Sequence, residues 1–182
     1  MRVSTHYSEK YFSEFFKTLI INVPNFPKEG VIFRDISKIL TYPSFVEIIT
    51  DCLYNNTNKD IDMVVGLDAR GFIIAPLLAQ TFNCGFAMCR KPTKLPPPFS
   101  EMEYNLEYGT NKLSLSSNII KKGMKVHVHD DILATGGSAQ CAIKLIEKMG
   151  AEVVSLSFII ELTELNGKEK LKGYDYYSLI KY

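Results

Sequence analysis

Two adjacent carboxylates stand just before a glycine-rich turn in the segment Lys125–Ser138, KVHVHDDILATGGS. Asp130 and Asp131 follow an alternating stretch typical of a β-strand, and the turn leads into helical spacing of apolar residues. The backbone N–H groups of Gly136 and Gly137 can approach a ligand closely, and a helix N-terminus favours a phosphate. The carboxylates can accept hydrogen bonds from a diol. These residue types predict a site for a ribose 5-phosphate at the carboxyl end of a strand, where open α/β sheets bind ligands.

Two other interpretations of this segment stay open. The glycine turn could be an ordinary cap of the following helix, with no ligand. The run HVHDD at residues 127–131 could instead bind a metal ion, as His-x-His patterns do in hydrolases built on (β/α)₈ barrels. The 182 residues of the chain fall short of the roughly 200–250 that such a barrel needs. We therefore expect His127 and His129 to be packed or hydrogen-bonded inside the strand.

The same segment resembles the phosphoribosyl pyrophosphate (PRPP) signature of the type I phosphoribosyltransferase family, in which an apolar strand, two acids and A-T-G-G-S/T follow one another. The resemblance implies that Asp130 and Asp131 bind the ribose of PRPP. The family usually has aliphatic residues where this chain has His127 and His129. The resemblance also implies that the 5′-phosphate lies against Ala134, Thr135, Gly136, Gly137 and Ser138.

A second strand–turn–helix unit is predicted around GLDARGF, residues 66–72, after the apolar strand Met63–Leu67. An arginine in such a turn can hold an anion through two parallel hydrogen bonds. Arg70 could instead pair only with Asp68. GLDARGF resembles the family's pyrophosphate loop, which implies a cis peptide bond between Asp68 and Ala69. The residues expected at the pyrophosphate are Asp68, Ala69, Arg70, Arg90, Lys91 and Lys94.

Residues 90–108 carry three cations followed by Pro96, Pro97 and Pro98. Proline cannot continue a helix or an interior strand, so we expect Leu95–Ser100 to lie outside regular structure. The family has a lid loop here that closes over the reacting ribose. The successive prolines should stiffen this lid, and its cations could serve the neighbouring subunit.

Three further segments resemble adenine phosphoribosyltransferases, a branch of the same family: NFPKEGVIFRDISKIL, EYNLEYG and ELTELNGKEKL. The resemblance implies that residues 1–40 form an N-terminal helix and a hood over the purine. Phe33 would stack on the base, which is worth about 1–3 kcal/mol, although plain core packing is the alternative. Backbone groups of Ile32 and Arg34 would bind the edge of the base, and Leu162 would flank it. Glu107 would be the catalytic residue, a carboxylate that manages the purine proton.

Composition and charge fit one soluble domain spanning residues 1–182. Hydrophobic residues make up 46% of the chain, charged residues 23%, and the net charge is +1, which favours neither nucleic acid nor membrane. No apolar run approaches the length of a membrane span. The first residues lack the apolar core of a signal peptide, and the four cysteines lack a Cys-x-x-Cys spacing. We expect a cytoplasmic protein with reduced cysteines.

Strands that alternate with helices predict an α/β fold with a mainly parallel, doubly wound sheet flanked by helices. The expected helices are Ser8–Val23, Ser44–Tyr54, one that runs through Phe72 to Leu78, and one that follows Ser138 and ends at Gly150. The expected strands are Val31–Phe33, Met63–Leu67, Gly85–Cys89, Lys112–Leu115, Val153–Ile160 and Tyr174–Leu179.

The resemblance implies a purine salvage reaction with Mg²⁺ as cofactor. The 5-phosphoribosyl group of PRPP would pass to adenine, giving AMP and pyrophosphate, in an enzyme that forms a homodimer. One alternative is a phosphoribosyltransferase for hypoxanthine or xanthine, against which the hood segment Val31–Arg34 argues. The other is a PRPP-binding regulator without catalytic activity.

Overall fold

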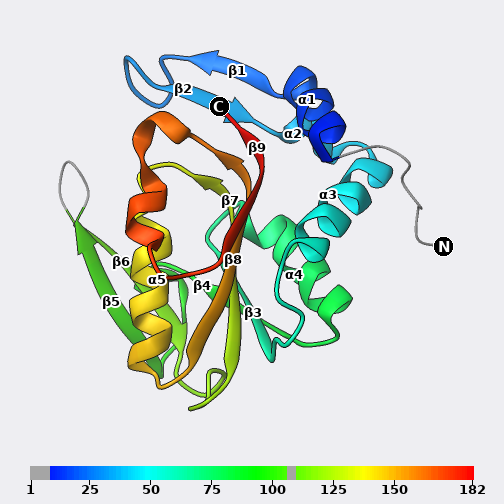
Figure 1. Ribbon diagram of the computed structural model, residues 1–182. Helices are drawn as coiled ribbons and strands as arrows, with labels where there is room; N and C mark the ends of the chain where they lie inside the picture. The colour runs from blue at the N-terminus through cyan, green and yellow to red at the C-terminus, as the bar shows by residue number, and fades with distance from the viewer. Residues whose placement is uncertain (1–8, 106–109) are drawn as a thin grey trace.

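The computed structural model describes residues 9–105 and 110–182. A five-stranded, entirely parallel sheet with the order β4-β3-β7-β8-β9 forms its centre (Figure 1). β3 is buried at every residue, as expected for a strand covered on both faces. The strands are β3 (Met63–Leu67), β4 (Gly85–Cys89), β7 (Lys125–Leu133), β8 (Glu152–Glu161) and β9 (Tyr176–Lys181).

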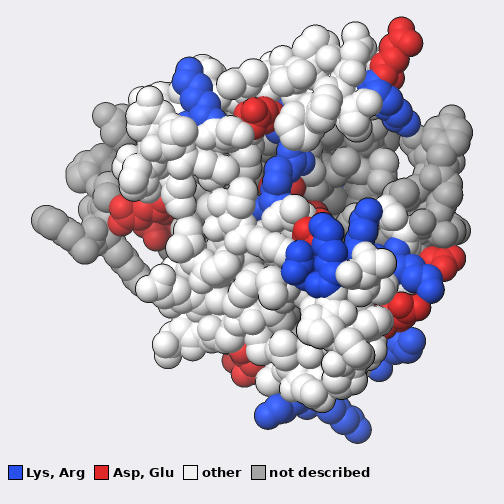
Figure 2. Space-filling model, turned by 180° about the vertical axis from the view of Figure 1, so that it is seen from behind, with Lys and Arg blue, Asp and Glu red and all other residues white. Residues whose placement is uncertain are grey.

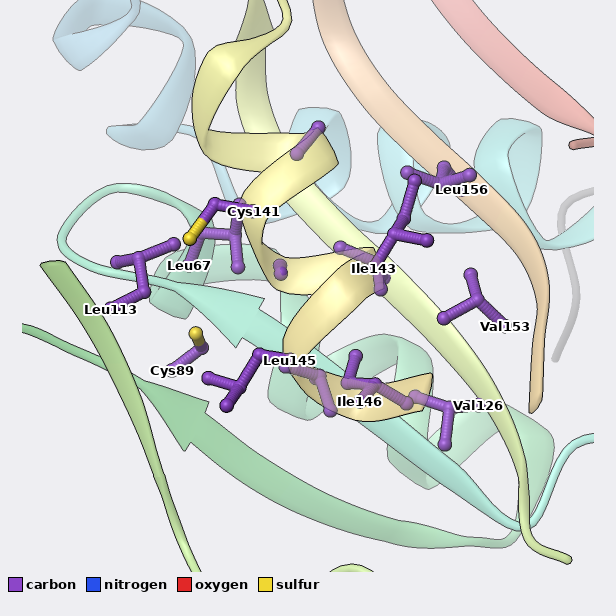
Figure 3. Packing of buried hydrophobic residues seen from close by; sticks show 14 of the residues in the cluster. Leu67, Cys89, Leu113, Val126, Cys141, Ile143, Leu145, Ile146, Val153 and Leu156 are labelled. Atoms are coloured by element: carbon purple, nitrogen blue, oxygen red, sulfur yellow. The ribbon is translucent and has the colours of Figure 1, made fainter. Parts of the chain in front are cut away.

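Helices cover both faces of this sheet, which confirms the predicted doubly wound α/β fold. α3 (Pro43–Asn55) and α4 (Gly71–Phe82) pack on one face together with α1 (Glu9–Leu19). α5 (Gly137–Lys148) covers the other face, and Figure 3 shows its Cys141, Leu145 and Ile146 directed toward apolar side chains of the strands. Each face therefore has its own apolar core. All four cysteines are free thiols, as predicted.

Two small antiparallel sheets flank the central one. β1 (Ile21–Pro24) pairs with β2 (Ile32–Asp35), and β5 (Phe99–Asn105) pairs with β6 (Thr110–Ser116). The short helices α2 (Ser37–Leu40), η1 (Pro92–Lys94), η2 (Thr163–Leu165) and η3 (Gly167–Leu171) complete the described elements. Among the described residues, no helix is long and apolar enough to cross a membrane.

Element ends differ from the prediction by one or two residues in several places, as for β2 and β9, and in two segments the type of structure differs. The helix expected over Ser8–Val23 ends at Leu19, because Ile21–Pro24 pairs with β2 instead. Alternating Ile21 and Val23 suit a strand as well as a helix, so local pattern could not separate the two. Phe99 and Ser100, expected outside regular structure, begin β5, where β6 provides backbone partners.

Candidate active site

The glycine turn after β7 forms a small cavity of about 150 Å³ at the carboxyl edge of the sheet. Gly136 is the N-cap of α5 and has a φ of +73°, a conformation that favours glycine. A Cβ at Gly136 would lie 2.5 Å from the carbonyl oxygen of Gly167, so the turn packs directly against η3. The cavity is lined by Asp130 and by Ile132, Leu133, Ala134, Thr135, Gly136, Gly137, Ser138 and Ala139, and thus by all five residues predicted at the 5′-phosphate.

The two acids lie inside β7, which runs on to Leu133, and their side chains have different surroundings. Asp131 is 4% exposed, and its Oδ2 lies 2.7 Å from Nε of Arg70. Burial raises the pKa of both carboxyl groups above the ordinary value, and repulsion from Asp131 raises that of Asp130 further. The positive charge of Arg70 opposes these effects, so both pKa values are raised less than they would be without it.

Arg70 reaches Asp131 because α4 begins very close to β7. A Cβ at Gly71 would lie 2.8 Å from the carbonyl oxygen of His129, so only glycine permits this approach. The alternative pairing of Arg70 with Asp68 is wrong, since the arginine pairs with Asp131. Its Nη1 is buried without a hydrogen-bond partner within the described chain, which leaves a donor for an anion.

Asp68 is instead the partner of two cations from the following loop. Its Oδ2 lies 3.1 Å from Nζ of Lys94 and 3.5 Å from Nε of Arg90, while Lys91 is exposed. The peptide bond between Asp68 and Ala69 is cis, as predicted. Seen from behind, the molecule is hollowed, and Lys and Arg side chains gather beside this hollow with carboxylates between them (Figure 2).

The hood segment reaches the same site through Phe33. The guanidinium carbon of Arg70 lies 4.6 Å from the centre of the Phe33 ring, and Phe26 meets that ring edge-on at 5.3 Å. Phe33 belongs to neither apolar core described above, which argues against plain core packing. Ile32 beside it is 49% exposed. Arg70 thus touches both the proposed base-stacking residue and Asp131, one of the proposed ribose acids.

Comparison with known proteins decides the family. The phosphoribosyl transferase domain family matches residues 35–181. The chain belongs to this phosphoribosyltransferase family.

Several proteins similar to this chain are adenine phosphoribosyltransferases. The adenine phosphoribosyltransferase of Nitrosopumilus maritimus is 46% identical over 164 residues, 90% of this chain and 96% of that protein. The enzyme of Christiangramia forsetii is 46% identical over 91% of this chain and 98% of its own. The crystal structure of adenine phosphoribosyltransferase from Thermoanaerobacter pseudethanolicus superposes with a TM-score of 0.90 at 39% identity, covering 93% of this chain and 99% of that one.

A yeast relative has been solved with a base in place. The Saccharomyces cerevisiae adenine phosphoribosyltransferase, complexed with adenine and an imino-altritol bisphosphate, is 34% identical with a TM-score of 0.84. The superposition covers 93% of this chain and 99% of the yeast chain. The fold therefore matches that of solved family members along nearly its whole length.

The two histidines of β7 are buried and hydrogen-bonded inside the sheet, as predicted. Both are fully buried. His127 bonds the hydroxyls of Ser155 at 2.9 Å and Ser157 at 2.7 Å, and His129 bonds Ser157 at 2.8 Å. Because both ring nitrogens of His127 are occupied, it is not available to a metal ion. Burial lowers the pKa of both imidazoles to about 3.

Two predicted features fall wholly or partly outside the structure described. Glu107 lies outside the described residues, and so does part of the expected lid at 90–108.

Leu162 lies at the carboxyl edge of the sheet, where its N–H donates to the carbonyl oxygen of Leu133 at 2.9 Å. It is thus held near the glycine turn.

Sequence reasoning missed two contacts of this site. One is the ion pair between Arg70 and Asp131, and the other is the contact of Arg34 with the ring of Tyr182. The partners in each pair are far apart along the chain, and no local pattern indicates either contact. Arg70 meets Asp131 because α4 begins close to β7, and Arg34 meets Tyr182 because the hood lies against the end of β9.

Proposed function

We propose that this protein is an adenine phosphoribosyltransferase of purine salvage, which makes AMP and pyrophosphate from adenine and PRPP. The observation that carries the proposal is the position of Arg70. It contacts both Asp131, proposed for the ribose, and Phe33, proposed for the base. A site built in this way suits a substrate with ribose and pyrophosphate at its centre and a flat base at one end.

We assign the 5′-phosphate of PRPP to the turn from Ala134 to Ser138. Backbone N–H groups at the start of α5 and the hydroxyls of Thr135 and Ser138 are donors suited to a phosphate. Asp130 and Asp131 would accept hydrogen bonds from the ribose hydroxyls. The positive φ of Gly136 and its contact with Gly167 support a turn held open for a ligand.

The pyrophosphate would lie beside the loop that follows β3. The backbone of Asp68 and Ala69 and the side chain of Arg70 face it in this assignment, and the unpartnered Nη1 of Arg70 supports an anion there. Arg90, Lys91 and Lys94 supply further positive charge. In the described structure, Arg90 and Lys94 are paired with Asp68. Pyrophosphate binding would therefore require these cations to exchange a carboxylate for a phosphate.

The reaction breaks the bond from C1′ to pyrophosphate and forms the bond from C1′ to N9 of adenine. Positive charge develops on C1′ as pyrophosphate leaves, and nearby carboxylates stabilise that charge more than they stabilise the neutral ground state. N9 of adenine loses its proton in the same process, and we propose that the carboxylate of Glu107 accepts this proton. The hood would position the base through Phe33 and backbone groups of Ile32 and Arg34, with Leu162 beside it.

We propose that Mg²⁺ enters this site together with PRPP. Among the described residues, no group of three or more His, Cys, Asp or Glu side chains could hold a metal. Mg²⁺ commonly binds through one or two carboxylates together with substrate phosphates, and Asp130 and Asp131 could supply that contact. The ion would offset the charge of the leaving pyrophosphate.

We further propose a cytoplasmic homodimer of one domain each, with residues 1–40 as helix and hood and residues 90–108 as lid. Ile73 on α4 is 40% exposed and Met88 on the edge strand β4 is 43% exposed, so an apolar surface is available on adjacent elements. Arg90 follows β4 directly. Light scattering of the purified protein would give its mass in solution.

The test of the reaction is product formation with Mg²⁺ and PRPP when adenine, hypoxanthine, guanine and xanthine are offered separately. AMP from adenine alone is the expected result. Turnover of an oxopurine instead would overturn the base assignment while keeping the fold and the PRPP site. PRPP binding without turnover of any base would indicate a regulator.

A further inference from the structure

Tyr182 follows β9 and holds the turn that contains Leu162. Its N–H donates to the carbonyl oxygen of Glu161 at 3.0 Å. Its own carbonyl oxygen accepts from the N–H of Thr163 at 2.9 Å and from the hydroxyl of Thr163. Glu161 and Thr163 stand on either side of Leu162. The backbone of Tyr182 therefore fixes one wall of the proposed purine site.

The ring of Tyr182 contacts the hood, which is the opposite wall. The guanidinium carbon of Arg34 lies 4.1 Å from the ring centre, and the end of β9 lies close to β2 (Figure 1). Arg34 Nη1 also donates to Oδ1 of Asn22 at 2.5 Å, which links β2 to β1. Nζ of Lys17, in α1, lies 5.7 Å from the same ring. One aromatic ring thus faces cations from both the hood and α1.

Arg34 and Tyr182 are both half-buried, and one polar atom of each is shielded from water. Nε of Arg34 and the hydroxyl of Tyr182 are both buried and lack a hydrogen-bond partner within the described residues. A cation over an aromatic face gains strength when both groups are desolvated. The hood needs such an anchor, because an isolated two-stranded sheet is only marginally stable in water.

We propose that Tyr182 is a positioning residue that sets the gap between the hood and the Leu162 turn, and thereby the affinity for adenine. The proposal rests on the function proposed above. The proposal distinguishes the two substrates, because the contacts of Tyr182 described above reach both walls of the purine site and involve neither the acid pair nor the phosphate turn. Loss of the Tyr182 ring should weaken adenine binding and leave PRPP binding nearly unchanged.

The test compares Tyr182→Leu with Tyr182→Phe in steady-state kinetics with both substrates varied. The leucine variant removes the aromatic face, so KM for adenine should rise about tenfold, within the range of about 2- to 30-fold that cation–π strengths imply. KM for PRPP should stay within about twofold of its value in the original protein, which is no more than the weakest cation–π contact would account for. The phenylalanine variant keeps the ring and should restore KM for adenine. Tyr174→Leu is a matched control, because Tyr174 bonds Glu147 elsewhere on the molecule.

A second substitution keeps the shape of the ring and so guards against misfolding. Pentafluorophenylalanine at position 182 retains the size of phenylalanine but loses the negative face of the ring, so KM for adenine should rise several-fold above that of Tyr182→Phe. An unchanged KM for adenine in both the leucine and the fluorinated variants would overturn the proposal. So would an equal rise in both KM values. If the unsubstituted protein does not use adenine, the proposed function fails instead, and the same assay reveals it.

Discussion

Replacing the buried histidine network of β7 and β8 should make the protein less sensitive to acid. The perturbation is His127→Val and His129→Val together with Ser155→Ala and Ser157→Ala. The serine changes are needed because a buried hydroxyl left without its partner costs about 1–3 kcal/mol. The fourfold variant replaces both partners of each hydrogen bond by apolar side chains, which can be nearly neutral at pH 7. It also removes Nε2 of His129, which is buried without a hydrogen-bond partner among the described residues.

The magnitude follows from the lowered pKa of the two imidazoles. Each pKa is about 3 in the folded protein, against an ordinary value of 6.5. Between these values the unfolded chain binds a proton at each histidine and the folded protein does not. Stability is therefore fully present above pH 6.5 and falls as the pH is lowered toward 3, by about 1.4 kcal/mol per pH unit for each histidine.

The combined effect is large compared with the stability of a typical domain. From pH 6.5 to 4.5, two histidines together remove about 5 kcal/mol of the free energy of unfolding, out of the roughly 5–15 kcal/mol that domains possess. Asp130 and Asp131 act in the opposite direction, because their raised pKa values let the folded protein take up protons first. They are present in every variant compared, so their contribution cancels.

The assay is urea unfolding followed by circular dichroism at several pH values between 7 and 4.5, at one protein concentration. The slope of the unfolding free energy against pH should be smaller in the fourfold variant by up to about 2.7 kcal/mol per pH unit. Ser155→Ala with Ser157→Ala alone keeps both histidines and should keep most of the slope. Equal slopes in the original protein and the fourfold variant would refute the argument that the folded imidazoles are neutral.

Three further predictions concern the proposed active site. Gly136→Ala should weaken PRPP binding at least tenfold, because the added Cβ would lie 2.5 Å from the carbonyl oxygen of Gly167. The free energy of unfolding should fall by more than the roughly 1–2 kcal/mol that a positive φ costs an alanine. Calorimetry measures the loss of binding, and urea unfolding measures the loss of stability. Arg70→Gln should raise the pKa of Asp131 further, so on acidification PRPP affinity should begin to fall at a higher pH than in the original protein. Glu107→Gln should lower turnover with adenine by about 10²–10⁴-fold.

Each of these has its own control. Gly123 has a φ of +84° with no atom within 4 Å of a Cβ, so Gly123→Ala should show the φ penalty and bind PRPP normally. Equal losses in both glycine variants would contradict the close-packing argument. For Arg70, an unchanged pH profile of PRPP affinity would show that the ion pair does not govern Asp131. Normal turnover of Glu107→Gln would remove Glu107 from the mechanism.

The sequence alone determined the fold class and the bounds of two central strands. β3 and β4 begin and end at the predicted residues, because a buried parallel strand is a short apolar run bounded by turn residues. The glycine turn at Ala134–Ser138 could also be predicted from adjacent residues, and the structure places them around a cavity at the start of α5. Features of this kind depend on residues that are adjacent in the chain, so the sequence alone reveals them.

Tertiary structure decided how distant segments meet. Arg70 pairs with Asp131 rather than with Asp68, because the order of β3 beside β7 and the close approach at Gly71 place them together. Ile21–Pro24 forms a strand because β2 offers backbone partners, although the local pattern also suits a helix. The ring of Tyr182 meets Arg34 only after β9 has docked on β8. Such contacts depend on packing between segments far apart in the chain, and no spacing within one segment encodes them.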